Sequence, residues 1–221
     1  KLSTVKLLVP IVAVAIQANS ASTVIPPYLD QMRIPVALIG TLISLAPLLA
    51  LASRLPVGMA YNHQRARFLV SIAILVMGAT NYLYSFATDS LSFALVHSMN
   101  GFVYGAVTTL YLAFYVDSLA PDENRNHAMG YYVGSLAMGY STGNFFGGLI
   151  ADHWGYALTF QLGAFLSPVS AGFLWFLHRA DGGTKSEIKK AGGKLTWSES
   201  LKGLVEAEVR SAVIVPKFLY L

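Results

Sequence analysis

The sequence has 221 residues, of which 55% are hydrophobic and 12% are charged. A soluble domain carries about 25% charged residues, so this chain has roughly half the charge that a water-facing surface requires. A mean hydropathy of +0.55 also excludes a disordered chain, which is poor in apolar residues and rich in charge. The chain contains no cysteine, which excludes disulfide frameworks, thiol catalysis and cysteine-ligated metal sites.

Six segments are long and apolar enough to cross a bilayer, which requires about 20 predominantly apolar residues. Nearly all charged residues fall between these segments. The sequence therefore predicts an all-α membrane protein whose residues 1–178 form a domain of six transmembrane helices. In chain order the predicted spans are Val5–Tyr28, Val36–Tyr61, Phe68–Ala87, Leu91–Val116, Met129–Ala151 and Tyr156–Leu177.

The distribution of Lys and Arg predicts the orientation in the membrane, because these residues concentrate on the cytoplasmic side. With the N-terminus in the cytoplasm, the outer segments hold Arg33 alone. We therefore expect a multi-pass protein of the plasma or inner membrane, with its N-terminus and central loop cytoplasmic. This bias accounts for the net charge of +4, and no nucleic-acid partner is expected. The cytoplasmic segments hold Lys1, Lys6, Arg65, Arg67, Arg125, Arg179, Lys185, Lys189, Lys190, Lys194 and Lys202.

The residues after the sixth span change in character. Residues 179–195 are rich in Gly, Lys and Asp, which predicts a cytoplasmic linker. Thr196-Trp-Ser-Glu199 is typical of a capping box and predicts an amphipathic interfacial helix over 196–209. Residues 210–221 are apolar again but too few to cross a bilayer, so we expect the start of a seventh transmembrane helix and a chain that is incomplete.

An internal repeat with an offset of 90 residues relates the two halves of the predicted bundle. Gly58-Met-Ala-Tyr-Asn62-His63 matches Gly148-Leu-Ile-Ala-Asp152-His153, each at the end of the second helix of a three-helix set. Because three is an odd number, the second set must be inverted in the membrane. Inverted three-helix repeats are typical of secondary transporters, which bind their ligand between the repeats near the membrane midplane.

The segment from Gly58 to Arg67 resembles a signature of the major facilitator superfamily, Gly-x-Leu-Ala-Asp-Arg-x-Gly-Arg-Arg. The resemblance implies the N-terminal half of that fold, with a C-terminal six-helix half that this chain lacks as its partner. In the family this segment is a latch that holds the two halves together on the cytoplasmic side. Here Asn62 replaces the usual carboxylate, and an ordinary basic loop is the alternative interpretation. The residues implied for the latch are Arg54, Gly58, Asn62, His63 and Arg67.

A second segment, in the fifth predicted span, resembles the family's pattern Gly-x-x-x-Gly-Pro-x-x-Gly-Gly. Glycines four residues apart lie on one helix face and allow a neighbouring backbone to approach closely. Helix packing is therefore the predicted role of Gly139, Gly143, Gly147 and Gly148, with Asn144 in place of the proline.

Polar residues of the first and fourth spans are the candidates for substrate binding, since the resemblance implies that these two helices line the transport cavity. On the fourth span they lie at spacings of three or four, which places them along one face. Hydrogen bonding between helices without any substrate is the alternative. The candidates are Gln17, Asn19, His97, Asn100, Tyr104 and Tyr111.

His97 is also the candidate for proton coupling, because it is the only titratable residue well inside a predicted span and a histidine titrates at about pH 6.5. It begins His97-Ser-Met-Asn100-Gly101, which stands where the family has Arg-x-x-Gln-Gly. A neutral histidine that forms hydrogen bonds between helices is the competing interpretation.

The sequence shows no phosphate-binding loop, Ser-His-Asp order, catalytic carboxylate pair or metal-ligand spacing. We therefore expect no enzyme activity, catalytic residue, metal or cofactor. The leading hypothesis is a secondary active transporter of a small organic solute, working by alternating access and coupled to protons as a symporter or antiporter, with the lipid bilayer and the solute as partners. The alternative is a non-transporting subunit or assembly factor of a membrane complex. The absence of a buried Asp or Glu disfavours a strongly cationic substrate and leaves neutral, amphipathic and anionic solutes open.

Overall fold

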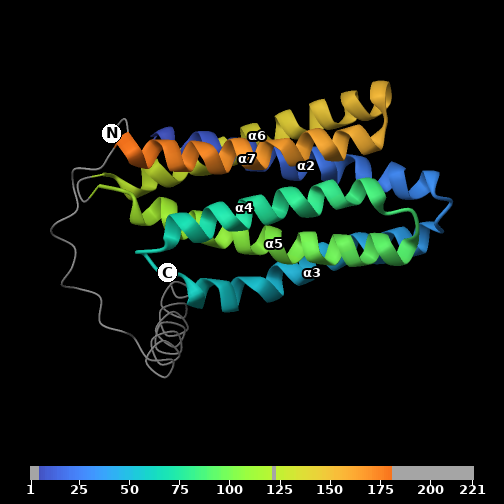
Figure 1. Cartoon of the computed structure of the whole chain (residues 1–221), viewed down its shortest axis with the longest axis horizontal. Coiled ribbons are helices and arrows are strands. Elements are labelled where there is room, and N and C mark those ends of the chain that lie inside the picture. The colour runs from blue at the N-terminus through green and yellow to red at the C-terminus, as the bar shows by residue number, and fades with distance from the viewer. Residues whose placement is uncertain (1–4, 121–122, 181–221) are drawn as a thin grey trace, which may run out of the picture. The chain divides into compact units, whose positions relative to one another are not determined.

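Six long helices make up most of residues 5–120 and 123–180, the residues that the computed structural model describes (Figure 1). No strand occurs within these two ranges. The predicted amphipathic helix at 196–209 and the predicted start of a seventh span at 210–221 lie outside them, as does the linker beyond Ala180. The elements are α2 (Leu8–Gln31), α3 (Val36–Ala60), α4 (Ala66–Leu83), the 3₁₀ turn η1 (Tyr84–Phe86), α5 (Ser90–Asp117), α6 (Arg125–Trp154) and α7 (Tyr156–Ala180).

The helices α2, α3, α4 with η1, α5 and α7 are each long and apolar enough to cross a membrane. The prediction of an all-α membrane fold is confirmed. Helix α6 has the length to cross, at 30 residues, but it is not among the five segments whose composition meets the requirement within the described ranges. Its role as a sixth span stays a prediction, because glycines and polar residues dilute its apolar character.

Polar caps and one glycine fix where the later helices begin and end. The Asp89 side chain accepts hydrogen bonds from the amides of Leu91 and Ser92 at the start of α5, both at 2.9 Å. The bonds from Ser92 hold the pKa of Asp89 below its usual range. Asn124 caps α6 in the same way. Gly155, with φ of 87°, ends α6 in a conformation that side chains disfavour, and α7 begins at the next residue.

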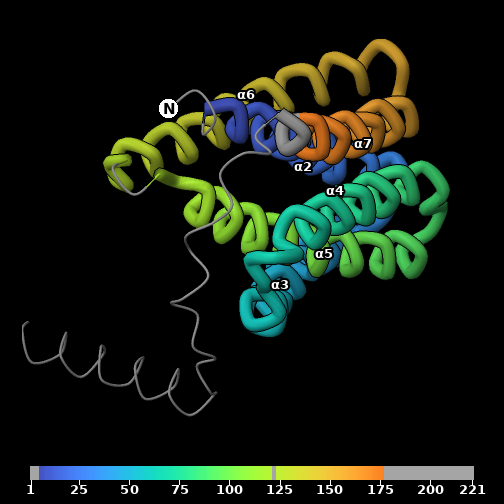
Figure 2. The backbone as a smooth tube through the Cα atoms, turned by 60° about the vertical axis from the view of Figure 1, so that its left-hand side comes forward, coloured from blue at the N-terminus to red at the C-terminus, as the bar shows by residue number. Residues whose placement is uncertain are grey.

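The helix contacts follow the symmetry expected of two three-helix repeats. Helices α2, α6 and α7 lie on one side of the bundle and α3, α4 and α5 on the other (Figures 1 and 2). The closest pairs are α2 with α6 and α3 with α5, followed by α4 with α7, α2 with α7, and α4 with α5. Exchanging α2 with α5, α3 with α6 and α4 with α7 reproduces this set of pairs. The packing therefore supports the repeat that the sequence predicts.

Glycines of α6 allow α2 to approach closely. A Cβ atom added at Gly139 would lie 2.5 Å from the Cβ of Ala15, and one added at Gly143 would lie 2.5 Å from the carbonyl oxygen of Ile16. Gly147 lies in the same way against the backbone of Ser20. Gly148 differs, because an added Cβ would meet no atom of the described residues within 4 Å. Three of the four glycines singled out in the sequence thus face α2.

A hydrogen bond beside this glycine face involves Asn144, which stands where the resembled pattern has proline. The Thr23 hydroxyl on α2 donates to the Asn144 Oδ1 at 2.6 Å. The asparagine therefore connects α6 to α2 by a side-chain contact that proline cannot form.

The equivalent pair of helices, α3 and α5, packs through Gly101 and Gly105, for which no packing role was predicted from the sequence. A Cβ atom added at Gly101 would meet the backbone of Ala46, and one added at Gly105 would meet Ala50 and the Ser53 hydroxyl. The segment Gly101-Phe-Val-Tyr-Gly105 has the same four-residue spacing, so the signal was present in the sequence.

Candidate functional site

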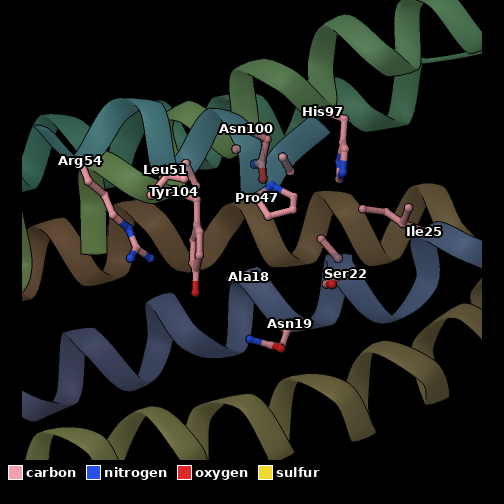
Figure 3. Close-up of a pocket in the computed structure, with 14 residues that line it drawn as sticks. Ala18, Asn19, Ser22, Ile25, Pro47, Leu51, Arg54, His97, Asn100 and Tyr104 are labelled. Carbon is pink, nitrogen blue, oxygen red and sulfur yellow. The ribbon is translucent and has the colours of Figure 1, made fainter. Parts of the chain in front are cut away.

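A cavity of about 440 Å³ lies between α2, α3 and α5 (Figure 3). Its apolar lining includes Ile25 of α2 and Pro47 and Leu51 of α3. Ligand pockets are typically apolar with a few polar groups that orient the ligand, and this cavity fits that description. The polar residues that line it are Asn19, Ser22, Arg54, His97, Asn100 and Tyr104.

Four of the six predicted substrate-binding residues therefore lie together at this cavity: Asn19, His97, Asn100 and Tyr104. The other two are not among its lining residues. The side chain of Gln17 is fully buried and accepts a hydrogen bond from Ser167 Oγ of α7 at 2.6 Å. The buried Tyr111 hydroxyl donates to the Leu7 carbonyl at 2.6 Å. In the sequence, Gln17 is a candidate as a polar residue of the first span and Tyr111 through its helical spacing on the fourth. Neither signal specifies which neighbouring helix a side chain meets.

His97 lies at the cavity wall with 6% of its surface exposed. Its Nδ1 is 2.7 Å from the Tyr84 hydroxyl, and its Nε2 is 3.3 Å from the Ile43 carbonyl. Its ring stacks on Phe93 at a centroid distance of 5.2 Å. A neutral imidazole fits these partners, with Tyr84 donating to Nδ1 and Nε2–H donating to Ile43. His97 therefore connects α5 to α3 and η1 while it contacts the cavity.

The two asparagines of the cavity each use their amide nitrogen within the protein. Asn100 Nδ2 donates to Thr80 Oγ1 at 3.0 Å and to Asn81 Oδ1 at 2.9 Å. Asn19 Nδ2 donates to the Ala15 carbonyl at 3.2 Å. In the described part of the chain neither Oδ1 accepts a hydrogen bond, so both carbonyls are available as acceptors at the cavity.

Arg54 and Tyr104 extend from α3 and α5 toward α2 and lie next to each other (Figure 3). The Tyr104 hydroxyl is 3.1 Å from the hydroxyl of Tyr140 on α6. In the sequence, Arg54 is implied for the latch because it precedes the Gly58–Arg67 segment by one helical turn. The structure places it among the cavity residues, because its side chain extends toward α2.

The other residues assigned to the latch lie around the end of α3 and the start of α4. His63 Nδ1 is 3.0 Å from Asp117 Oδ2 at the end of α5, while Asn62 Oδ1 accepts a hydrogen bond from the Gln64 amide at 2.9 Å. Gly58 faces Thr109 of α5, and Arg67 lies in the first turn of α4. The predicted latch segment is thus connected to α5 through His63.

Asp117 supplies a carboxylate at this end of the bundle, although it was not among the predicted latch residues. The Tyr61 hydroxyl donates to Asp117 Oδ2 at 2.7 Å. Burial, followed by this hydrogen bond to the carboxylate, raises the pKa of Tyr61, so Tyr61 stays a donor at neutral pH. In the sequence, Asp117 is marked only by its position directly after the predicted fourth span. The packing of the helices is needed to show that it contacts the α3–α4 loop.

Comparisons with known proteins agree with the all-α membrane fold described above. The sequence profile of the Major Facilitator Superfamily matches residues 7–220. An uncharacterized MFS-type transporter of Methanocaldococcus jannaschii is 25% identical over 119 residues, which cover 54% of this chain. The match spans 31% of the length of that relative.

Proposed function

Because the chain belongs to the major facilitator superfamily, we propose that it forms the N-terminal half of a secondary active transporter of a small organic solute. The chain is an integral, multi-pass membrane protein, and its family points to a transporter rather than an enzyme. In this proposal a second six-helix half completes the solute site, and the two halves alternate in access to the two sides of the membrane.

The observation that carries the proposal is the cavity between α2, α3 and α5. Helices α2 and α5 occupy equivalent places in the two repeats, so the cavity lies where transporters with inverted repeats bind their ligand. Polar side chains on membrane helices are costly unless they face protein or water. Asn19, Asn100 and Tyr104 face a cavity large enough for a small molecule. Polar side chains that served only to form hydrogen bonds between helices would not require such a cavity.

The proposal includes an orientation with the N-terminus and the α3–α4 loop in the cytoplasm. Arg65 and Arg67 belong to that loop, whereas Arg33 lies in the α2–α3 loop at the opposite end of the bundle. The positive-inside rule supports this orientation in a plasma or inner membrane.

We also propose that transport is coupled to protons and that His97 is the coupling residue. This residue contacts the cavity and also forms hydrogen bonds to η1 and α3, so a change in its charge acts on the cavity and on helix packing together. Arg54 and Tyr104 are the other charged or titratable residues at the cavity. Burial disfavours an imidazolium, and hydration of the cavity during alternation favours it.

The first prediction is that His97→Gln abolishes accumulation driven by a pH gradient and preserves passive exchange. Glutamine can accept from Tyr84 and donate to Ile43, but it does not titrate. The full-length protein in proteoliposomes is screened with small organic solutes, and uptake of a transported solute is then measured with and without an imposed pH gradient.

Ser170→Ala on α7 is a control that removes a buried hydroxyl away from the cavity lining, and it should leave coupling intact. Accumulation by His97→Gln at the parent level would overturn proton coupling by His97. If no solute is transported by the folded parent protein, transport itself is overturned and a non-transporting subunit of a membrane complex becomes the better hypothesis.

A further inference from the structure

The cavity contains one permanently charged residue and no acidic counterpart. That residue is the arginine Arg54, and no Asp or Glu is among the lining residues. Within 5–120 and 123–180, no carboxylate lies within ion-pair distance of Arg54. A cation on a membrane helix is costly unless it is paired or hydrated. The lining of the cavity supplies no negative group that could pair with Arg54.

The surroundings of Arg54 are suited to a carboxylate. A guanidinium binds a carboxylate through two parallel hydrogen bonds. Tyr104 lies beside Arg54 (Figure 3), and its hydroxyl can donate to a ligand when Tyr140 donates to it, since the two hydroxyls are 3.1 Å apart. Two donor side chains from different helices thus lie at the same end of the cavity.

The rest of the lining favours an apolar ligand body with a single negative charge. Ile25, Pro47 and Leu51 supply apolar surface beyond the Arg54 end. A phosphate monoester carries about 1.5 to 2 negative charges at neutral pH, more than one guanidinium balances. A carboxylate carries one.

We propose that the cavity binds an organic monocarboxylate, with its carboxylate on Arg54 and Tyr104 and its apolar body along Ile25, Pro47 and Leu51. The proposal rests on the proposed transport function and specifies its substrate class. It assigns Arg54 to substrate recognition, a role separate from the latch that the sequence suggested.

The test uses matched pairs of probes on the purified full-length protein. Benzoate is compared with benzamide, hexanoate with hexanamide, and both acids with benzyl phosphate, at constant ionic strength, by thermal shift and titration calorimetry. The parent should bind each acid about tenfold or more tightly than its amide, as expected for a lost charge-assisted hydrogen bond. Arg54→Gln should remove this preference. Arg125→Gln, an exposed arginine outside the cavity, should keep it.

Arg54→Lys gives a second measurement if Arg54→Gln does not fold. Lysine keeps the charge but not the planar fork, so it should bind the acids more weakly than the parent and still prefer them to the amides. The proposal is overturned if the amides bind as well as the acids, if the preference survives Arg54→Gln, if benzyl phosphate is preferred, or if none of the probes binds. Uptake of neutral solutes by the parent in any of these cases would leave the transport function standing.

Discussion

Gln17 and Ser167 form a buried polar pair between α2 and α7. The Ser167 hydroxyl donates to Gln17 Oε1 at 2.6 Å, and both side chains are completely buried. The Gln17 Nε2 has no hydrogen-bond partner among the described residues. The hydroxyl of Ser167 is therefore the one side-chain group that satisfies Gln17, and the pair connects α7 to α2, which lines the cavity.

We expect Ser167→Ala to destabilise the protein by about 1–3 kcal/mol, because it leaves a buried acceptor without a donor. The measurement is the free energy of unfolding in detergent. Ser71→Ala is the matched control, since the Ser71 hydroxyl is equally buried but forms no hydrogen bond in the described structure, and it should change stability little. Equal effects of the two substitutions would show that the bond to Gln17 contributes nothing.

At the scale of the helix, small residues decide which helices pair. Gly139, Gly143 and Gly147 bring α6 against α2, and Gly101 and Gly105 bring α5 against α3. Lipid offers no hydrophobic driving force between helices, so close backbone packing must supply the attraction. The two glycine faces belong to equivalent helix pairs of the two repeats. They explain why α2 with α6 and α3 with α5 are the most closely packed pairs of the bundle.

Gly143→Ala should lower stability by about 1–3 kcal/mol, because overpacking forces backbones apart. The added methyl group would lie 2.5 Å from the Ile16 carbonyl oxygen. Gly148→Ala has open space around it and should be neutral or stabilising, since alanine is the better helix former. Melting temperatures of the two variants in one detergent provide the comparison. A Gly143→Ala protein as stable as the parent would contradict the close approach of α2 and α6.

At the scale of the whole molecule, the latch hypothesis concerns the alternation between two states. If Asn62 is a weakened substitute for the family's carboxylate, Asn62→Asp should strengthen closure at the cytoplasmic end and favour the outward-facing state. Asp117 already provides a carboxylate nearby, but it is engaged by Tyr61 and His63. Asn62 is exposed and bonds only within its own loop, so its side chain is free to act on another part of the protein.

Labelling of a cysteine introduced at Ser22, a cavity residue, measures this change, since the chain has no cysteine of its own. With a membrane-impermeant thiol reagent added outside, Asn62→Asp should label faster than the parent. Asn124→Asp is the control, because aspartate caps a helix as well as asparagine does. Unchanged labelling in the Asn62 variant would argue that the segment is an ordinary loop.

The sequence by itself determined the fold class, the helices and the family. A span is a property of consecutive residues, because every backbone group in lipid must be satisfied within its own helix. Segment composition therefore located all six long helices to within a few residues at most ends, and the Gly58–Arg67 segment identified the superfamily that the profile match confirms.

Only the tertiary structure decided which side chains share the cavity. Periodicity places Asn100, Tyr104 and Tyr111 on one side of α5, but each depth of the helix meets a different neighbour. At the depth of Tyr111 the neighbour is Leu7, the N-cap of α2, whose carbonyl accepts a hydrogen bond from the Tyr111 hydroxyl. At the depth of Tyr104 the space between α2 and α3 stays open, and Arg54 enters it. A side chain's role depends on the distance between helices at its level, which residues far apart in the sequence set together.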